Sequence, residues 1–489
     1  MSTRQKLILL SFVFIGSVMA TTAKQPLNFI FLIADDISQE DIGCYGHPSI
    51  KTPNIDRLAK EGRRFDEGYV VASSCSPSRC SVITGRYPHN TGAPELHSHL
   101  PASQIMFPKL LQNVGYYTVI SGKIHMGPNI NKAFNKVSRG KGLGKEGDWV
   151  QLLQQRPKDK PFFFWFASTD AHRPAEFSPE APVYDYDDMI VPPYMVDGPK
   201  TRYELSTYAH EVSRFDYYVG QVVEELEKQG VLDNTLIIVI ADNGRPFPRA
   251  KTRLYDSGTK VPFVAYQRGV IKPGPSSSLV SSIDIAPTIL EAAGVDKDQR
   301  IQGVSFMPIL KDPSATTRDM IFTEHNWHLW IAHERMVRFG DWLYIRNNMP
   351  DRESVAYETY DGGFGEELVA ARKAGKLTDA QKMVFLNPCP EEELYHVGND
   401  PHQIKNLAEN PEYANVMQQA QGLLQEWTEQ TGDTIPENPT TDYVQINETF
   451  VGIGCRPMVQ GQVKHPHLEL PGDAAGAQTI NHPGPIRLK

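Results

Sequence analysis

Acidic, amide and imidazole side chains follow three separate apolar runs, at residues 28–34, 161–167 and 236–241. The polar residues that end these runs are Asp35-Asp36, Asp170 with His172, and Asp242-Asn243. Such runs are typical of parallel strands buried on both faces, whose carboxyl ends share one edge of a sheet, so we expect these side chains to meet there. Oxygen ligands without a matching Cys and His set favour a hard cation, Ca²⁺ or Mg²⁺, over zinc. The alternative interpretation is that each Asp is a helix cap or turn residue.

A second chemical signature lies in residues 73–86, SSCSPSRCSVITGR. Cys75, Pro77-Ser78-Arg79 and Thr84-Gly85 resemble the signature of the type I sulfatases, in which the cysteine is oxidised after synthesis to formylglycine. The resemblance implies that a formylglycine-generating enzyme modifies Cys75. In that family one hydroxyl of the aldehyde hydrate attacks sulfur, and the other expels sulfate as the aldehyde re-forms. The alternative is that Cys75 is a small buried hydrophobic residue.

The resemblance covers most of residues 25–430 and implies roles for further residues. The implied ligands of a divalent cation, usually Ca²⁺, are Asp35, Asp36, Cys75 as formylglycine, Asp242 and Asn243. The implied catalytic residues are Cys75, Arg79, Lys123, His125, His172 and Lys251. Arg79 would hold the formylglycine, and Lys123 and Lys251 would bind sulfate. His125 would take the hydroxyl proton, and His172 would hydrogen-bond the ester oxygen and protonate the leaving group. A sulfuryl group in a transition state needs cations around its oxygens, an activated nucleophile and a proton donor, which this set supplies.

Two stretches resemble a narrower group, the heparan N-sulfatase (sulfamidase) subgroup, which also includes bacterial enzymes acting on O-sulfated polysaccharides. They are KIHMGP, from Lys123, and DNGRPFPRAKTRLY, from Asp242. The subgroup typically has arginine at the Lys251 position, so the sequence leaves O-sulfate and N-sulfate open. Further candidate substrate contacts, with turn residues as the alternative, are His325 and His328 in TEHNWHLW, and His97, His99, Arg245 and Arg249. Together they predict a cationic pocket for uronic acid or additional sulfates.

The pattern of helices and strands predicts how these residues are positioned. Helices at residues 54–60, 107–113 and 204–228 alternate with the apolar strands and with a strand at 116–121. This alternation predicts an α/β fold with a large, mostly parallel sheet between helices, which the resemblance makes alkaline-phosphatase-like. Short strands at 336–337, 342–345 and 393–397 and a helix at 413–427 predict a smaller C-terminal antiparallel sheet with a helix against it.

The ends of the chain differ from the body. Arg4 and Lys6 precede an apolar run over residues 7–20 that ends in small residues, which predicts a signal peptide over residues 1–20. The run is shorter than the roughly 20 residues of a membrane-spanning helix, so we expect no membrane anchor and an exported, periplasmic or secreted product. We expect a catalytic domain over residues 21–335 and a C-terminal subdomain over residues 336–489, with an irregular tail from about residue 432.

The charge balance limits the partners. The 489 residues include 49 Lys and Arg against 58 Asp and Glu, a net charge of −9 that becomes −11 when the predicted signal peptide is removed. This balance argues against nucleic acid as a partner and requires a local positive pocket for any anionic ligand. The cysteines other than Cys75 are Cys44, Cys80, Cys389 and Cys455, and the sequence leaves their pairing open.

The leading hypothesis is a secreted sulfatase that hydrolyses sulfate esters on a sulfated carbohydrate such as ulvan, carrageenan or a glycosaminoglycan. One alternative is a heparan-type N-sulfatase. A second is a phosphonate or phosphodiester hydrolase, because relatives on the same fold also use a formylglycine. A glycan-binding protein without turnover is the alternative from another class. The sequence leaves open the polysaccharide, the sulfate position, endo or exo action and the oligomeric state.

Overall fold

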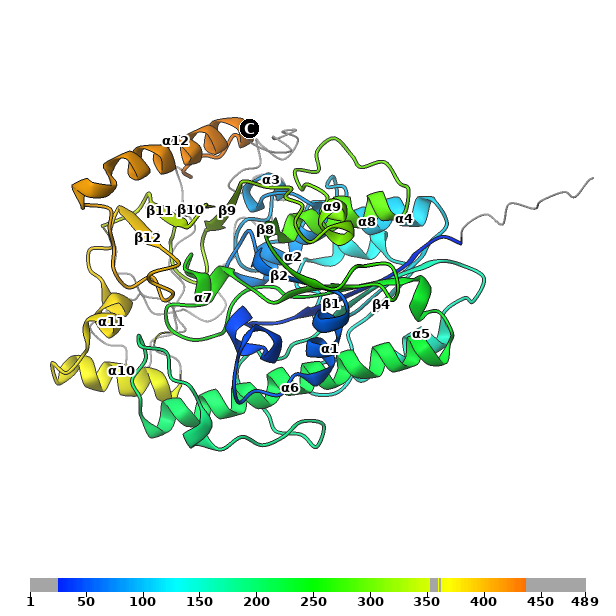
Figure 1. Ribbon diagram of the computed structural model, residues 1–489, viewed down its shortest axis with the longest axis horizontal. Coiled ribbons are helices and arrows are strands. Elements are labelled where there is room, and N and C mark those ends of the chain that lie inside the picture. The colour runs from blue at the N-terminus through cyan, green and yellow to red at the C-terminus, as the bar shows by residue number, and fades with distance from the viewer. Residues whose placement is uncertain (1–24, 352–358, 360–361, 437–489) are drawn as a thin grey trace, which may run out of the picture.

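The computed structural model describes residues 25–351, 359 and 362–436. Its main element is an eight-stranded sheet in the order β4-β3-β5-β1-β6-β7-β2-β8 (Figure 1). In that order the strands are β4 (Lys136–Ser138), β3 (Tyr117–Gly122), β5 (Phe162–Ala167), β1 (Asn28–Ala34), β6 (Thr235–Ala241), β7 (Phe263–Tyr266), β2 (Arg63–Tyr69) and β8 (Gly274–Ser281). The first five strands run parallel, and only β7 is antiparallel to its neighbours, so the predicted mostly parallel sheet is confirmed.

Helices cover both faces of this sheet because its central strands are apolar on both sides. Alternate β1 residues pack into two cores: Ile30 and Leu32 into one, Phe29 and Phe31 into the other. The first core is closed by α1 (Pro53–Glu61), α5 (Trp149–Gln155), α6 (Pro199–Lys228) and α10 (Gly363–Lys373). The second is closed by α2 (Cys75–Thr84), α4 (Phe107–Asn113), α8 (Ile285–Ala292) and α9 (Met307–Lys311). Figure 1 shows the two layers, with the long α6 along one of them.

A second sheet lies beside the first and has four antiparallel strands, in the order β12-β11-β10-β9. These strands are β12 (Glu392–His396), β11 (Trp342–Asn347), β10 (Glu334–Phe339) and β9 (Met320–His325). Helix α12 (Ala414–Thr431) packs on it, with the Trp427 ring stacked on Phe322 at 5.1 Å between centroids. The predicted small antiparallel sheet with a helix against it is therefore present (Figure 1).

The observed elements extend or add to the predicted ones. Helix α6 begins at Pro199 rather than at residue 204, because proline suits the first helical turn. The prediction missed strands β2, β4, β7, β8 and β9 and helices α2, α5, α8, α9 and α10. It also missed the short helices α3 (Pro88–Thr91), α7 (Asp256–Thr259) and α11 (Asp379–Lys382). Since β9 belongs to the second sheet, that sheet has residues on both sides of position 335, and the domain boundary stays a prediction.

Several predictions fall on residues outside the described part of the chain. These are the signal peptide at residues 1–20, Cys455 and most of the tail from residue 432. Within the described residues, Cys44, Cys75 and Cys80 are free thiols. No helix in that part is long and apolar enough to cross a membrane.

Candidate active site

Three neighbouring strands bring their polar ends together as the sequence predicts. β1 pairs with β5 and β6 in parallel, so Ala34 lies opposite Ala241 and the residues after both strands are adjacent. The Asp36 backbone N–H donates to Asp242 Oδ1 at 3.1 Å, and Asn243 Nδ2 donates to Asp36 Oδ1 at 2.7 Å. All four predicted oxygen ligands, Asp35, Asp36, Asp242 and Asn243, are fully buried.

Cys75 is the first residue of α2 and faces the same acidic pair. Its Sγ lies 3.9 Å from Asp36 Oδ1, and possible ligand atoms of Asp35, Asp36 and Cys75 lie within 4.8 Å of one another. Because the N-terminus of a helix is positive, it favours negative charge developing on this side chain. Burial raises the pKa of the encoded Cys75 thiol to about 12, so the unmodified thiol is a poor nucleophile at neutral pH. We call Cys75 and the four oxygen ligands the strand-end cluster.

Three cations surround the strand-end cluster: buried Arg79 and Lys251, and partly buried Lys123. Arg79, one turn along α2, donates from Nε to Asp242 Oδ2 at 2.7 Å. Lys251 Nζ lies 2.7 Å from Asp36 Oδ2, and Lys123 donates to Asp35. Gly122 places Lys123 there: its φ is 98°, and a Cβ would lie 1.8 Å from the Ala167 carbonyl oxygen.

The electrostatics of the cluster follow from these pairs. Burial alone would raise the pKa of Asp36, but Lys251 and His172 outweigh it and hold that pKa below its ordinary value. Three carboxylates and three cations cancel formally, so a bound divalent cation would leave the cluster with a net positive charge. That charge is the local positive pocket that the acidic chain requires for an anionic ligand.

Two histidines lie at the edge of the cluster. His172 has a side chain that is 43% exposed, and its Nε2 lies 4.0 Å from Asp36 Oδ2. His125 has φ 52° and contacts His97, whose Nδ1 lies 2.6 Å from His125 Nε2. Burial, Lys123 and His97 hold the pKa of His125 well below its ordinary value, so its imidazole is neutral and able to accept a proton.

The donor set fits a hard divalent cation. Asp35 Oδ1 and Asn243 Oδ1 are buried and accept no hydrogen bond from the described residues. Buried oxygens without donors are costly unless a cation satisfies them. Asp35, Asp36, Asp242 and Asn243 are therefore the residues that would hold the ion, together with the side chain at position 75.

Other residues singled out in the sequence have structural partners. Asp170 also follows an apolar strand, but both its carboxylate oxygens accept from Arg214 at 2.7 Å, so its side chain is not part of the strand-end cluster. Arg245 is buried against Glu40 and Asp41. Arg249 donates to the carbonyls of residues 402 and 403 and lies 3.6 Å from the centroid of the Tyr255 ring. These two arginines were expected in a cationic substrate pocket, and they link segments of the chain instead.

The two substrate-contact candidates of β9 and the loop after it differ in position. His328 Nδ1 lies 2.7 Å from Ser74 Oγ, beside the first residue of α2. His325 is buried, with Nδ1 2.7 Å from Glu334 Oε2. A role of either residue in substrate binding stays a prediction, as do the catalytic and ligand roles of the residues above.

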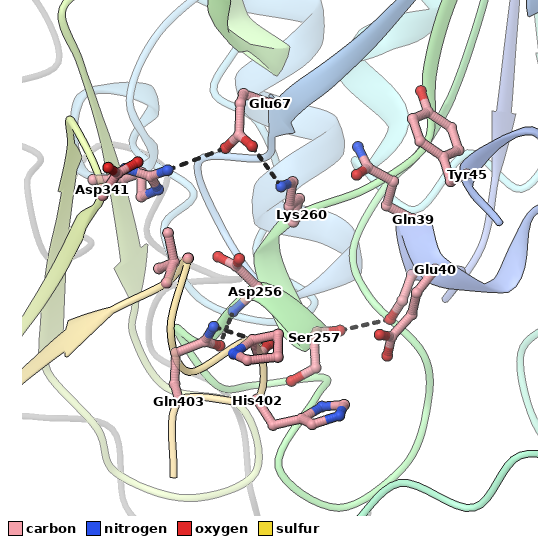
Figure 2. A pocket seen from close by; sticks show the side chains of 15 residues that line it. Gln39, Glu40, Tyr45, Glu67, Asp256, Ser257, Lys260, Asp341, His402 and Gln403 are labelled. Carbon is pink, nitrogen blue, oxygen red and sulfur yellow. Dashed lines mark hydrogen bonds and ion pairs between the residues drawn. The ribbon is translucent and has the colours of Figure 1, made fainter. Parts of the chain in front are cut away.

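Surface hollows of the described residues also lie outside the cluster. Figure 2 shows one, of about 320 Å³, which is lined by residues including Glu40, Glu67, Asp256, Asp341, Lys260 and Arg338. Its carboxylates outnumber its Lys and Arg, and Glu67 pairs with both cations, so it is unsuited to an anionic substrate. Another hollow, of about 350 Å³, lies beside His125. It includes Arg139, which the sequence analysis missed because it lies in a glycine-rich stretch without a motif.

The sulfatase family profile matches residues 27–149 and 147–295, which contain every residue of the strand-end cluster. The chain belongs to the sulfatase family. It is accordingly a sulfuric ester hydrolase, as the leading hypothesis predicts. The matched ranges also contain Arg79 and Lys123, which lie in the first of them, and Lys251, which lies in the second.

Individual relatives of this sulfatase are distant but span most of it. An ulvan-active sulfatase of Formosa agariphila is 26% identical, covering 94% of this chain and 84% of that protein. Human N-sulphoglucosamine sulphohydrolase is 28% identical, and the match covers 85% of this chain and 92% of that protein.

Among solved structures, a protein bound to its substrate D-glucosamine-2-N,6-O-disulfate has a TM-score of 0.66 at 22% identity, and the match covers 83% of this chain and 98% of that one. A second structure, in complex with a neocarrahexaose, has a TM-score of 0.62 at 22% identity, and the match covers 83% of this chain and 93% of that one. These two structures share the fold.

Proposed function

We propose that this sulfatase hydrolyses sulfate esters on a sulfated carbohydrate, a polysaccharide or its oligosaccharides, and uses Cys75 converted to formylglycine together with Ca²⁺. The single observation that carries the proposal is the placement of Cys75 at the start of α2, facing buried Asp35 and Asp36. The carbohydrate class is supported by an ulvan-active sulfatase and an N-acetylglucosamine-6-O-sulfatase among the relatives.

The chain's own residues fit the demands of sulfuryl transfer. The formylglycine hydrate supplies the nucleophilic hydroxyl, and Ca²⁺ supplies positive charge toward a sulfate oxygen. Lys123 and Lys251 place ammonium groups at the buried acids, where they would bind the remaining sulfate oxygens. His172 is exposed enough to reach a leaving-group oxygen, and neutral His125 is suited to take a proton.

Export is part of the proposal. A positively charged start followed by residues 7–20 supports a signal peptide, and with it a periplasmic or secreted enzyme that meets a formylglycine-generating enzyme before it is active. Sequencing the mature N-terminus of protein recovered outside the cytoplasm tests the cleavage. A mature chain that still contains residues 1–20 would contradict it.

The central experiment pairs modification with turnover. Co-expression with a formylglycine-generating enzyme, followed by mass spectrometry of the peptide around Cys75, should show the loss of mass that accompanies formylglycine formation. Modified enzyme should release sulfate from at least one member of a panel of sulfated oligosaccharides. Cys75→Ala should release none, whereas Cys80→Ala, a change on the same helix, should remain active. An unmodified Cys75 that nevertheless supports full turnover would refute the proposed nucleophile.

N-sulfate is the second candidate, favoured by the similarity to human N-sulphoglucosamine sulphohydrolase. Lys251 stands where that subgroup typically has arginine, and a lysine ammonium binds sulfate as a point charge rather than as a planar fork. We therefore expect faster release of O-sulfate than of N-sulfate from matched glucosamine derivatives. A higher kcat/KM for the N-sulfate would favour the second candidate.

A further inference from the structure

A hollow beside His125 is built by loops that hold each other in place. The Leu100 backbone N–H donates to the Met126 carbonyl at 3.0 Å, and Asn129 Nδ2 donates to the Leu100 carbonyl at 3.0 Å. These bonds join the segment that contains His97 and His99 to the loop that follows β3. The hollow measures about 350 Å³, within the range of sites that bind small molecules.

The side chains of this hollow are fixed by close contacts. His97 and His125 lie with ring centroids 4.7 Å apart. A Cβ at Gly127, whose φ is 77°, would lie 2.7 Å from His99 Cγ, so the His99 ring packs directly on the glycine backbone. His99 is therefore held against the wall of the hollow by a position that only glycine fits.

The hollow is suited to an anion. Its lining has three histidines and Arg139, and no acidic residue contributes to it. Arg139 is exposed, and among the described residues it forms no ion pair. Ile124 and Pro128 add apolar surface for the carbon face of a sugar ring. An unpaired guanidinium above an apolar wall matches a sugar with a carboxylate or sulfate substituent.

One loop contributes to both the hollow and the reaction centre. His125 lines it, while Lys123, two residues earlier, contacts Asp35 in the strand-end cluster. The Lys123 carbonyl also accepts from Arg79 Nη1 at 3.0 Å. A sugar ring whose sulfate ester lies at the cluster would therefore have a neighbouring group within reach of this hollow.

We propose that the hollow formed by His97, His99 and Arg139 is a subsite for a second acidic substituent of the substrate, a uronate carboxylate or a further sulfate near the ester that is cleaved. This inference rests on the proposed carbohydrate function and names the substrate class more closely: oligosaccharides with a second anionic group beside the reacting sulfate. Arg139 supplies the charge-assisted hydrogen bonds, and the histidines orient the ring.

Binding separates this subsite from catalysis. In a Cys75→Ala background, calorimetry compares three ligands: a sulfated disaccharide with a uronate, its carboxyl-reduced counterpart, and that counterpart with a second sulfate. Arg139→Gln should weaken binding of the two ligands with a second anion about tenfold, the effect of losing one charge-assisted contact, and should change the reduced ligand less than about twofold. Lys141→Gln, which removes another exposed cation outside the hollow, should leave all three affinities unchanged.

The possible outcomes are distinguishable. Equal effects of Arg139→Gln on all three ligands, or equal effects of Lys141→Gln and Arg139→Gln, would overturn the subsite. Loss of affinity for only one of the two anionic ligands would identify that group as the occupant. If formylglycine-containing enzyme releases no sulfate from any of these sugars while Arg139→Gln still weakens anion binding selectively, the proposed function fails and the subsite stands. Thermal unfolding of each variant confirms that it is folded.

Discussion

Two buried clusters in this protein bring a similar set of donor atoms together, yet they differ in how their charges are satisfied. In the strand-end cluster, possible ligand atoms of Asp35, Asp36 and Cys75 lie within 4.8 Å of one another. The same spacing holds for His89, Glu324 and Asp433, which with Arg335 form what we call the His89 cluster. Both clusters are excluded from water. Proximity of acidic groups therefore does not by itself distinguish a metal site from a structural one.

The difference lies in what faces the carboxylates. Arg335 donates to both oxygens of Asp433, at 2.6 and 2.9 Å, and His89 Nδ1 lies 2.6 Å from Glu324 Oε1. One guanidinium and one protonated imidazole thus balance two carboxylates. The strand-end cluster instead retains buried acceptor atoms without donors, on Asp35 and Asn243. We infer that the His89 cluster links α3, the second sheet and the residues after α12, whereas the strand-end cluster is open to a ligand.

The largest effect should come from breaking the charge pairing of the His89 cluster. Asp433→Asn removes the carboxylate that Arg335 binds with two hydrogen bonds. Among the described residues, this buried guanidinium is then paired only with Glu324, at 3.9 Å, so we expect a loss of about 3–5 kcal/mol in the free energy of unfolding. Denaturant titration measures it. The double variant Asp433→Leu with Arg335→Met, which removes both charges, should recover much of that loss. A single variant as stable as the parent would contradict the closed-pair interpretation.

Removing a cation beside the strand-end cluster should slow turnover. Lys251→Ala takes away an ammonium group 2.7 Å from Asp36, and we expect kcat to fall about 10²–10³-fold, as for other fixed charges that stabilise a transition state. Steady-state sulfate release measures it. Lys260→Ala, which breaks a pair with Glu67 elsewhere, is the matched control. If both variants lose the same activity, the loss is not specific to the cluster.

Calcium should distinguish the clusters directly. An ion that binds only the folded protein stabilises it by about 2.7 kcal/mol at a concentration 100 times its dissociation constant. Adding Ca²⁺ to chelator-treated protein should raise the Tm, and Asp35→Asn should remove that increase. Glu324→Gln should retain it in full, even if its starting Tm is lower. Loss of the increase in the Glu324 variant would place the ion in the His89 cluster.

The smallest effect is a pH dependence of stability. Burial opposes the charge on His89, but Glu324 and Asp433 outweigh it and hold the pKa of His89 above its ordinary value of 6.5. Its contribution to stability should therefore be complete below pH 6.5 and be lost as the pH rises through the higher folded-state pKa. The neighbouring His333, whose pKa is lowered to about 3, gives the opposite trend, with stability declining as the pH falls below 6.5.

The two trends separate in a difference measurement. Subtracting the unfolding free energy of His89→Gln from that of the parent at each pH removes most of the contribution of His333, because both proteins retain it and His89 is the smallest of the causes that shift its pKa. The difference should be largest below pH 6.5 and shrink toward alkaline pH. A difference that grows with pH would show that His89 is neutral in the folded protein.

Local patterns in the sequence predicted much of the fold and the strand-end cluster. The apolar runs before Asp35 and Asp242 specify strands buried on both faces, and parallel strands must end at one edge. The segment around Cys75 carries its own chemical signature. These features depend on neighbouring residues, so they can be found without a structure. Asp170 shows the limit: it follows a strand as the others do, but Arg214 of α6 turns its carboxylate into a structural pair.

Only the tertiary structure decided which residues, distant in sequence, complete each cluster and the hollow. Asp433 meets His89 across most of the chain, because α12 returns the chain to the second sheet after residue 431. Arg139 meets His97 and His99 because it follows β4, which pairs with β3, and the loop after β3 is joined to the His97 segment at Leu100 and Met126. Side-chain type and local spacing determined the chemistry available to this protein. The packing of segments far apart in sequence determined which charges are satisfied and which remain open to a ligand, since electrostatic pairing depends on distance in space.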